Sequence, residues 1–216
     1  MNRVSVVKII GLVISMLLSG CTTNITDNNV SGNDLTATEV IRLMGNGINL
    51  GNTLEAYNHK SYVDSGVNPT SFETLWGQPV TTRDMIDDMK ALGFDTLRIP
   101  VAWTNGINYE SGDYTIDERL MNRVDEVVNY ALDADMYVIL NDHWDGSWWG
   151  MFGSSEQSDV DKAFEMYKSM WTQIANRYKK YSDRLIFEGA NEELGDRLND
   201  TDVCKNSGSL SKAECY

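Results

Sequence analysis

The 216-residue chain has few histidines and cysteines, the residues that most often bind zinc. Its only histidines are His59 and His143, and its only cysteines are Cys21, Cys204 and Cys215. None of them has the spacing of a His-x-x-x-His or Cys-x-x-Cys motif, which argues against a zinc site. A lone histidine is more often structural, and we interpret His59 in this way. We therefore expect no metal ion and no cofactor.

The chain is also poor in positive charge. It has 18 Lys and Arg against 32 Asp and Glu, for a net charge of −14. So acidic a chain repels nucleic acid and anionic lipid headgroups, which argues against both as partners. No glycine-rich phosphate loop follows the first predicted strand, which argues against nucleotides. The balance suits a neutral, polyhydroxylated substrate such as a polysaccharide, without identifying it.

No apolar run is long enough to span a bilayer comfortably as a mature helix. The longest, Ile9–Leu18, follows the basic residues Arg3 and Lys8, which is typical of a signal peptide over residues 1–20. It is followed by Leu18–Cys21, which resembles a bacterial lipobox, so Cys21 is the predicted site of lipidation. The alternative is an ordinary secretory signal that ends near a cysteine. Both interpretations export the protein, either anchored at the cell envelope by lipid or secreted.

Residues 21–34 are rich in Asn, Thr, Ser and Gly and are predicted to be a flexible tether. The folded domain is predicted over residues 35–216. Near its end, Cys204 and Cys215 flank a polar loop, and in an oxidising compartment they can form a disulfide. Two free thiols are the alternative.

Strands and helices alternate along the domain in units of about forty to fifty residues, which indicates a parallel sheet of the α/β class. The predicted strands are Gly47–Asn52, Asp95–Val101, Met136–Asn141 and the apolar run that begins at Arg184. The predicted helices are Thr36–Met44, a helix that Thr81-Thr82-Arg83-Asp84 opens and that runs to Leu92, one that Asp117 caps, and Asp159–Tyr181. Their expected core residues are Met85, Ile86, Met89, Leu92, Leu120, Val124, Val127, Val128, Ala131, Phe164, Tyr167, Trp171, Ile174 and Tyr178.

Each predicted strand ends in polar side chains: Asn49 and Asn52, Arg98, His143, then Asn191 and Glu192. In a TIM barrel the reacting groups lie at the C-terminal ends of several strands, whereas a doubly wound sheet gathers them at one crevice. We therefore predict a (β/α)8 TIM barrel, here an incomplete one of about four β/α units. A protonated Glu192 can donate to a leaving oxygen, so the set is suited to hydrolysis. A solvated turn is the alternative for Asn191 and Glu192 considered alone.

Five tryptophans also fall in the predicted loops after strands: Trp76, Trp103, Trp144, Trp148 and Trp149. An exposed indole ring is costly unless something covers it, and the flat face of a pyranose ring can do so. We expect some of these tryptophans to bind a sugar and about half to plug the top of the barrel instead.

Several of these segments, in this order, resemble glycoside hydrolase family 5, and most of all its bacterial endo-β-1,4-glucanases (cellulases). The segments are Gly47-Ile48-Asn49-Leu50-Gly51-Asn52-Thr53, Trp76-Gly77-Gln78-Pro79, Gly93 to Trp103, and Phe187-Glu188-Gly189-Ala190-Asn191-Glu192. The resemblance implies a retaining enzyme on a TIM barrel that cleaves β-1,4-glucan.

The resemblance also implies a role for each matching residue. Glu192 corresponds to the general acid/base, and Asn191 to the residue that contacts the sugar 2-hydroxyl. Arg98 is expected to support the nucleophilic carboxylate and His143 to line the site. The predicted substrate contacts are Asn49, Trp103, Trp144, Trp148 and Trp149.

The chain departs from the family at two positions and in its length. His143 is followed by a tryptophan where close relatives often have a second histidine, and Glu193 stands where proline is common. The family takes its nucleophilic glutamate from a later strand, for which the chain offers no candidate. We therefore expect an N-terminal half of such an enzyme, whose activity alone is doubtful. The alternatives are a non-catalytic glycan-binding lipoprotein, and a mannanase or xyloglucanase on the same scaffold.

Overall fold

The computed structural model describes residues 35–57, 66, 68–143 and 148–191. The chain divides into two units, residues 1–31 and 32–216, and every described residue belongs to the second. No helix in this described part is long and apolar enough to cross a membrane. The predicted signal peptide and tether lie outside it, as do Cys21, His59, Trp144, Glu192, Cys204 and Cys215.

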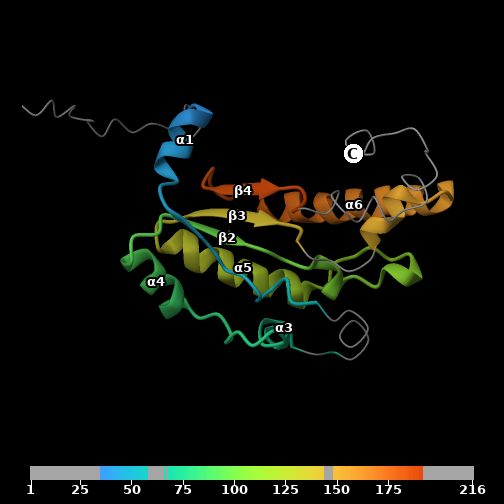
Figure 1. The fold of residues 1–216 in the computed structure, drawn as a ribbon, viewed down its shortest axis with the longest axis horizontal. Coiled ribbons are helices and arrows are strands. Elements are labelled where there is room, and N and C mark those ends of the chain that lie inside the picture. The colour runs from blue at the N-terminus through green and yellow to red at the C-terminus, as the bar shows by residue number, and fades with distance from the viewer. Residues whose placement is uncertain (1–34, 58–65, 67, 144–147, 192–216) are drawn as a thin grey trace, which may run out of the picture. The chain divides into compact units, whose positions relative to one another are not determined.

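Four parallel strands form one sheet, in which they lie side by side in the order of the sequence (Figure 1). They are β1 (Gly47–Asn49), β2 (Thr96–Ile99), β3 (Tyr137–Asn141) and β4 (Leu185–Glu188). This arrangement confirms the prediction of an α/β fold with four parallel strands. Because all four run in the same direction, their C-terminal ends meet at one edge of the sheet.

The two faces of the sheet differ in character. One carries Leu97, Ile99, Val138 and Leu140, which are all fully buried and belong to the main hydrophobic cluster. Side chains alternate between the faces along a strand, so the residues between these point to the other side. That second face carries polar groups, because Asn49 pairs with Arg98 in the register and Asn141 pairs with Glu188.

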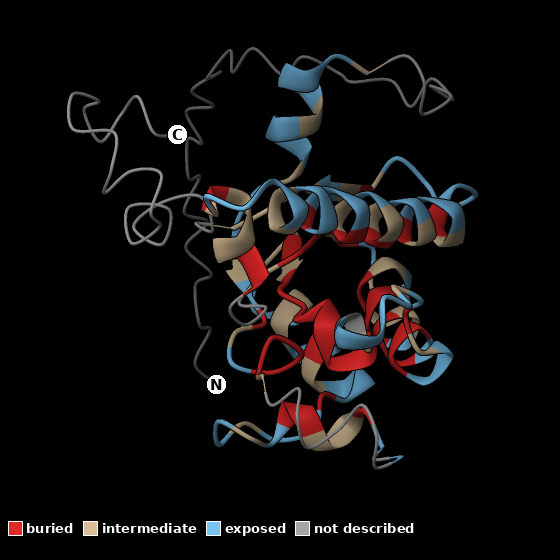
Figure 2. Cartoon of the chain, turned by 90° about the vertical axis from the view of Figure 1, so that its right-hand side faces the viewer, coloured by how far each residue is buried: buried red, intermediate tan, exposed pale blue. Residues whose placement is uncertain are grey.

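Helices connect the strands and supply the rest of the core. The α-helices are α1 (Ala37–Leu43), α3 (Thr70–Glu73), α4 (Arg83–Ala91), α5 (Glu118–Asp133) and α6 (Gln157–Tyr178), and the 3-10 helices are η1 (Trp103–Gly106), η2 (Tyr109–Ser111) and η3 (Trp148–Gly153). Buried residues, red in Figure 2, gather between these elements. The helix that Asp117 was predicted to cap is confirmed, since its side chain accepts a hydrogen bond from the backbone N–H of Arg119.

The predicted core face is confirmed for α5 and only partly for α4 and α6. Leu120, Val124, Val127, Val128 and Ala131 of α5 are all buried. In α6 the buried stripe is instead Ala163, Met166, Met170, Ile174 and Tyr178.

Two expected core residues are exposed, Phe164 of α6 and Leu92, which lies just beyond α4. The aromatic side chains Phe164, Tyr167 and Trp171 lie beside the buried stripe of α6, and Leu92 is the C-cap of a nine-residue helix whose buried contact is Ile86. The prediction was wrong at these two positions because a hydrophobic side chain next to a buried stripe has almost the same helical spacing as one within it.

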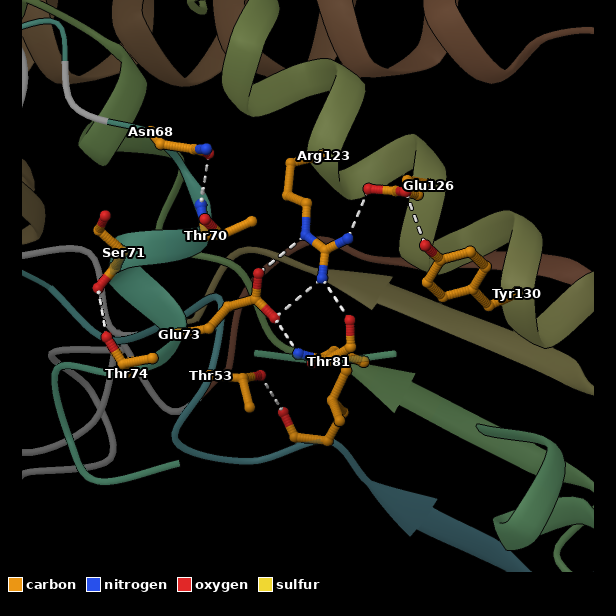
Figure 3. A network of polar contacts seen from close by, with 11 residues as sticks. Thr53, Asn68, Thr70, Ser71, Glu73, Thr74, Thr81, Arg123, Glu126 and Tyr130 are labelled. Atoms are coloured by element: carbon orange, nitrogen blue, oxygen red, sulfur yellow. Dashed lines mark hydrogen bonds and ion pairs between the residues drawn. The ribbon is translucent and has the colours of Figure 1, made fainter. Parts of the chain in front are cut away.

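A buried ion pair joins the segment after β1 to α5 (Figure 3). Arg123 Nε donates to Glu73 Oε1 at 2.8 Å, and Arg123 Nη2 donates to Glu73 Oε2 at 3.1 Å and to the carbonyl of Thr81 at 2.6 Å. The backbone N–H of Thr81 donates to Glu73 Oε2 at 2.7 Å. Glu73 is completely buried and the Arg123 side chain is 7% exposed. This network therefore fixes the connection between β1 and α4 against α5.

We expect Arg123→Met to lower the free energy of unfolding by about 3 kcal/mol, because it leaves the buried Glu73 carboxylate without its cation. Urea denaturation measures this change. The combined variant Arg123→Met/Glu73→Leu should lose less, since it removes both charges together. Arg119→Ala, which breaks the exposed pair with Asp117, is the control and should cost at most about 1 kcal/mol. Equal losses for the Arg123 and Arg119 variants would contradict the role of the buried pair.

Candidate active site

A single guanidinium, that of Arg98, connects the ends of three strands. Arg98 is the third residue of β2 and pairs in the register with Asn49, the last residue of β1. Its Nη1 donates to Asn49 Oδ1 at 3.0 Å, and its Nη2 donates to Asn191 Oδ1, beyond the end of β4, at 2.9 Å. Three of the residues predicted to form the site are therefore brought together.

The main partner of Arg98 is Glu188, the last residue of β4. Arg98 Nε donates to Oε2 at 2.7 Å and Nη2 donates to Oε1 at 2.8 Å, which is a bidentate arrangement. These hydrogen bonds from Arg98 lower the pKa of Glu188, against the opposing effect of partial burial, and they raise the pKa of Arg98. The sequence alone does not single out Glu188, because it lies within a family motif and at the end of an apolar run. Its position at a strand end is the signal that identifies it.

The guanidinium also orients the two amides. Asn49 and Asn191 each turn the side-chain oxygen toward Arg98, so each NH2 group is directed to other partners. The backbone N–H of Asn191 donates to the carbonyl of Asp142 at 3.1 Å, which fixes the main chain at the same residue. Asn191 is thus held through its backbone and its side chain, and Glu192 is the next residue in the sequence.

His143 lies on the neighbouring strand end, in reach of the same group of residues. Its backbone N–H donates to the carbonyl of Val101 at 2.9 Å, and its Nδ1 lies 3.2 Å from Asn141 Nδ2. These two nitrogens are within hydrogen-bond distance, and which of them donates depends on the tautomer of the ring. The amide of Asn141 and the charge of His143 also help to lower the pKa of Glu188, after the larger effect of Arg98. His143 therefore lies beside the cluster, and its role in lining a site stays a prediction.

A second carboxyl, that of Glu55, was also missed. It is 3% exposed and accepts hydrogen bonds from the backbone N–H groups of Asn52 and Thr53, the latter at 2.8 Å. Burial raises the pKa of Glu55, and the backbone hydrogen bonds and the charge of Arg98 oppose this effect. Asn52, predicted as a strand-end polar group, has a φ of 60°, so the chain turns sharply here and the carboxyl stabilises the turn. Glu55 thereby fixes the turn that directly follows Asn49 and β1.

Three of the predicted tryptophans are buried, whereas Trp76 is exposed. Trp103 and Trp148 are at most 1% exposed and Trp149 is 3% exposed. Trp103 Nε1 donates to the carbonyl of Asn141 at 3.0 Å, and Trp148 stacks on Trp149 with centroids 4.3 Å apart. Their burial favours the alternative that they plug the top of the sheet. Contact between these three side chains and a substrate stays a prediction, as it does for Trp144, outside the described residues.

The described residues provide hydrogen bonds and fixed charge: a guanidinium, two oriented amides, an imidazole and a paired carboxylate. No group of three or more His, Cys, Asp or Glu side chains within the described ranges could hold a metal ion. Such a set can bind and orient a polar ligand. The proton transfer that hydrolysis needs was assigned to Glu192, which lies outside the described residues.

Comparisons with known proteins agree on one family. The family model for cellulase (glycosyl hydrolase family 5) matches residues 60–207. Endoglucanase B of Clostridium cellulovorans is 44% identical over 159 residues, which are 74% of this chain and 32% of that protein. A xyloglucan-specific endo-β-1,4-glucanase of Bacteroides ovatus is 37% identical over 175 residues, which are 81% of this chain and 33% of that protein.

Solved structures give the same result. A broad specificity endoglucanase from Clostridium longisporum superposes with a TM-score of 0.65 at 40% identity, covering 73% of this chain and 43% of that one. One from Ruminococcus champanellensis with bound cellotriose has a TM-score of 0.64 at 43% identity, covering 73% and 44%. The chain thus spans 32% of the length of the C. cellulovorans protein and under half of these solved structures.

We expect Arg98→Met to raise the pKa of the Glu188 carboxyl from its lowered value, because the substitution removes the cation that stabilises the charged form. A carbon-detected NMR titration of the glutamate carboxyls measures this shift. The lowered pKa of Glu126, which depends on Tyr130 and Arg123, should not change and is the control.

The same ion pair makes stability depend on pH. A carboxyl whose pKa is lowered by folding contributes its stabilisation above the unfolded pKa of about 4.3 and loses it as the pH falls through the folded value. The difference in unfolding free energy between the natural chain and Glu188→Gln should therefore be constant above about pH 5 and shrink below it. A difference that grows on acidification would contradict the ion pair.

Proposed function

We propose that this chain, which belongs to glycosyl hydrolase family 5, serves in the retaining hydrolysis of β-1,4-glucan, with Glu192 as the general acid/base. Family membership rests on the match over residues 60–207 and on relatives that are endoglucanases. The substrate and the roles of single residues are our proposal.

The observation that supports the proposal most is the arrangement around Arg98. Its guanidinium holds Glu188 and Asn191, on either side of the β4 exit, and Asn49 across the sheet. The side chain and the backbone of Asn191, the residue that precedes Glu192 in the sequence, are both held by hydrogen bonds. Effective acid catalysis depends on such positioning, because the proton must be delivered within hydrogen-bond distance of the leaving oxygen.

Each residue has a defined task in the proposed reaction. Glu192 donates its proton to the departing glycosidic oxygen and then activates water as a base. Asn191, with its oxygen bound to Arg98, offers its NH2 group to the sugar 2-hydroxyl. His143 lines the site. A retaining mechanism needs a second glutamate about 5 Å from the first, and we propose that it comes from outside these 216 residues.

The alternatives are hydrolysis of another glycan and glycan binding without cleavage. A xyloglucan-specific enzyme is among the relatives, which supports xyloglucan as a second candidate substrate, and a mannan is the third. A surface protein that binds glycans without cleaving them is the alternative from a different class. Binding without the release of reducing ends would identify it.

The protein as its gene encodes it should release reducing ends from carboxymethylcellulose and cellotetraose. Glu192→Gln should lower kcat by a factor of about 100 or more, because a glutamine cannot transfer the proton. Binding of cellotetraose, measured by calorimetry, should be retained in this variant. The control is Glu165→Gln on the exposed side of α6, which should keep full activity. Unchanged hydrolysis in Glu192→Gln contradicts the assignment, and a panel of xyloglucan and mannan decides the substrate.

We propose further that the protein is exported and carries lipid on Cys21, on the basis of the apolar run and lipobox-like sequence of its leader. Labelled palmitate should enter the natural protein in a bacterial host and be absent from Cys21→Ser. Secretion of an unlabelled natural protein would support an ordinary secretory signal instead.

A further inference from the structure

The carbonyl oxygen of Gly189 accepts two hydrogen bonds from α6. Tyr167 Oη donates to it at 3.1 Å and Trp171 Nε1 donates to it at 3.2 Å. Tyr167 and Trp171 are four residues apart, so they lie on the same face of the helix, one turn from each other. Gly189 is the first residue after β4, and its two acceptor positions are both used by this pair.

The aromatic neighbours of this pair restrict its movement. The Tyr167 ring lies 5.7 Å from Trp149 and 6.4 Å from Trp171, between ring centroids, and Trp171 lies 6.0 Å from Phe187 of β4. Trp149 is itself buried and stacked on Trp148. The two donors are therefore held in place by packing that extends from η3 to the edge of the sheet.

The identity of residue 189 fits this contact. A Cβ added to Gly189 would lie 2.8 Å from Tyr167 Oη, closer than real Cβ atoms approach. Gly189 does not have a positive φ, so its backbone conformation alone does not require glycine. The absence of a side chain is needed here because it lets the tyrosine hydroxyl reach the carbonyl.

The carbonyl lies in the middle of the segment that carries the site. Arg98 binds Glu188 on one side of Gly189 and Asn191 on the other. Glu188 and Phe187 are adjacent in β4, so their side chains point to opposite faces of the sheet. The segment is thus held from one face by Arg98 and from the other by α6.

We infer that Tyr167 and Trp171 are positioning residues, which fix the Gly189 peptide and through it the amide of Asn191. They contact the backbone of Gly189, just after β4, and act on a ligand only through Asn191. The consequence for catalysis rests on the proposed function. The consequence for the geometry of Asn191 does not, since it follows from the contacts alone.

The first test is hydrogen exchange of the Asn191 backbone amide, measured by NMR on the protein as its gene encodes it. Tyr167→Phe keeps the ring and removes the donor, and Trp171→Phe removes the other donor. Each should speed exchange at Asn191 about five-fold, the factor for one lost neutral hydrogen bond. The amide of Val138, bonded to the carbonyl of Arg184 in the sheet, should not change.

Tyr181→Phe is the matched control. It removes a tyrosine hydroxyl that accepts a hydrogen bond from Asn129. The Tyr181 ring packs against Tyr178, at the end of α6. It should leave exchange at Asn191 unchanged. An equal effect of Tyr167→Phe and Tyr181→Phe on Asn191 would overturn the inference, because the tyrosine would then act only through general stability.

The second test uses the close approach at Gly189. Gly189→Ala should speed exchange at Asn191 at least as much as Tyr167→Phe, because its methyl group displaces the hydroxyl. The double variant Tyr167→Phe/Gly189→Ala should be no worse than Tyr167→Phe alone, since the obstacle is gone. Effects that simply multiply in the double variant would overturn the inference.

Hydrolysis supplies the readout that links position to function. Tyr167→Phe should lower kcat on cellotetraose about five-fold with KM almost unchanged, because Asn191 is assigned to a contact that strengthens in the transition state. A natural protein without hydrolytic activity sinks the proposed function and leaves the exchange result intact. Normal exchange in the variants sinks the positioning role whether or not the enzyme is active.

Discussion

The bidentate pair between Arg98 and Glu188 is the interaction on which the site depends. It joins β2 to the end of β4 with β3 between them, and the same guanidinium reaches Asn49 on β1. Arginine suits this task because its donors are coplanar and its charge is permanent. A lysine would present one point charge to partners that approach from three directions. This side chain thus joins polar residues of separate strands in one cluster.

The cluster can stay polar because the hydrophobic core packs against the other face of the sheet. Leu97, Ile99, Val138 and Leu140 are buried against the helices, and the Glu73–Arg123 pair fixes the long connection after β1. Stability and chemistry are thus supplied by alternate residues of the same short strands. Tyr167 and Trp171 of α6 contribute to both. Their rings pack against the core, and their side chains donate hydrogen bonds to the carbonyl of Gly189, the first residue after β4.

Much of this fold could be predicted from the sequence, because helix caps and apolar spacing are local signals. Asp117 and the buried face of α5 are examples, as is the alternation that indicates a parallel sheet. Phe164 could not be placed correctly, since spacing alone does not distinguish a buried stripe from its border. Arg98, Asn49 and Asn191 were predicted as polar strand ends, but Glu188 was not, because it lies within the apolar run of β4 and within a family motif. The burial of Trp148 and Trp149 likewise depends on tertiary packing.

The orientation of the Asn191 amide has a consequence for selectivity. Its oxygen is engaged by Arg98, so a bound molecule meets only N–H groups at this point. An oxygen lone pair satisfies such a group, whereas a hydrogen or methyl group in the same place leaves it unpaired after water has been displaced. Sites of this kind reject an analogue that lacks the hydroxyl far more strongly than an apolar pocket rejects a misfit. A ligand without an acceptor oxygen at this point would thus be rejected, although it is small enough to enter.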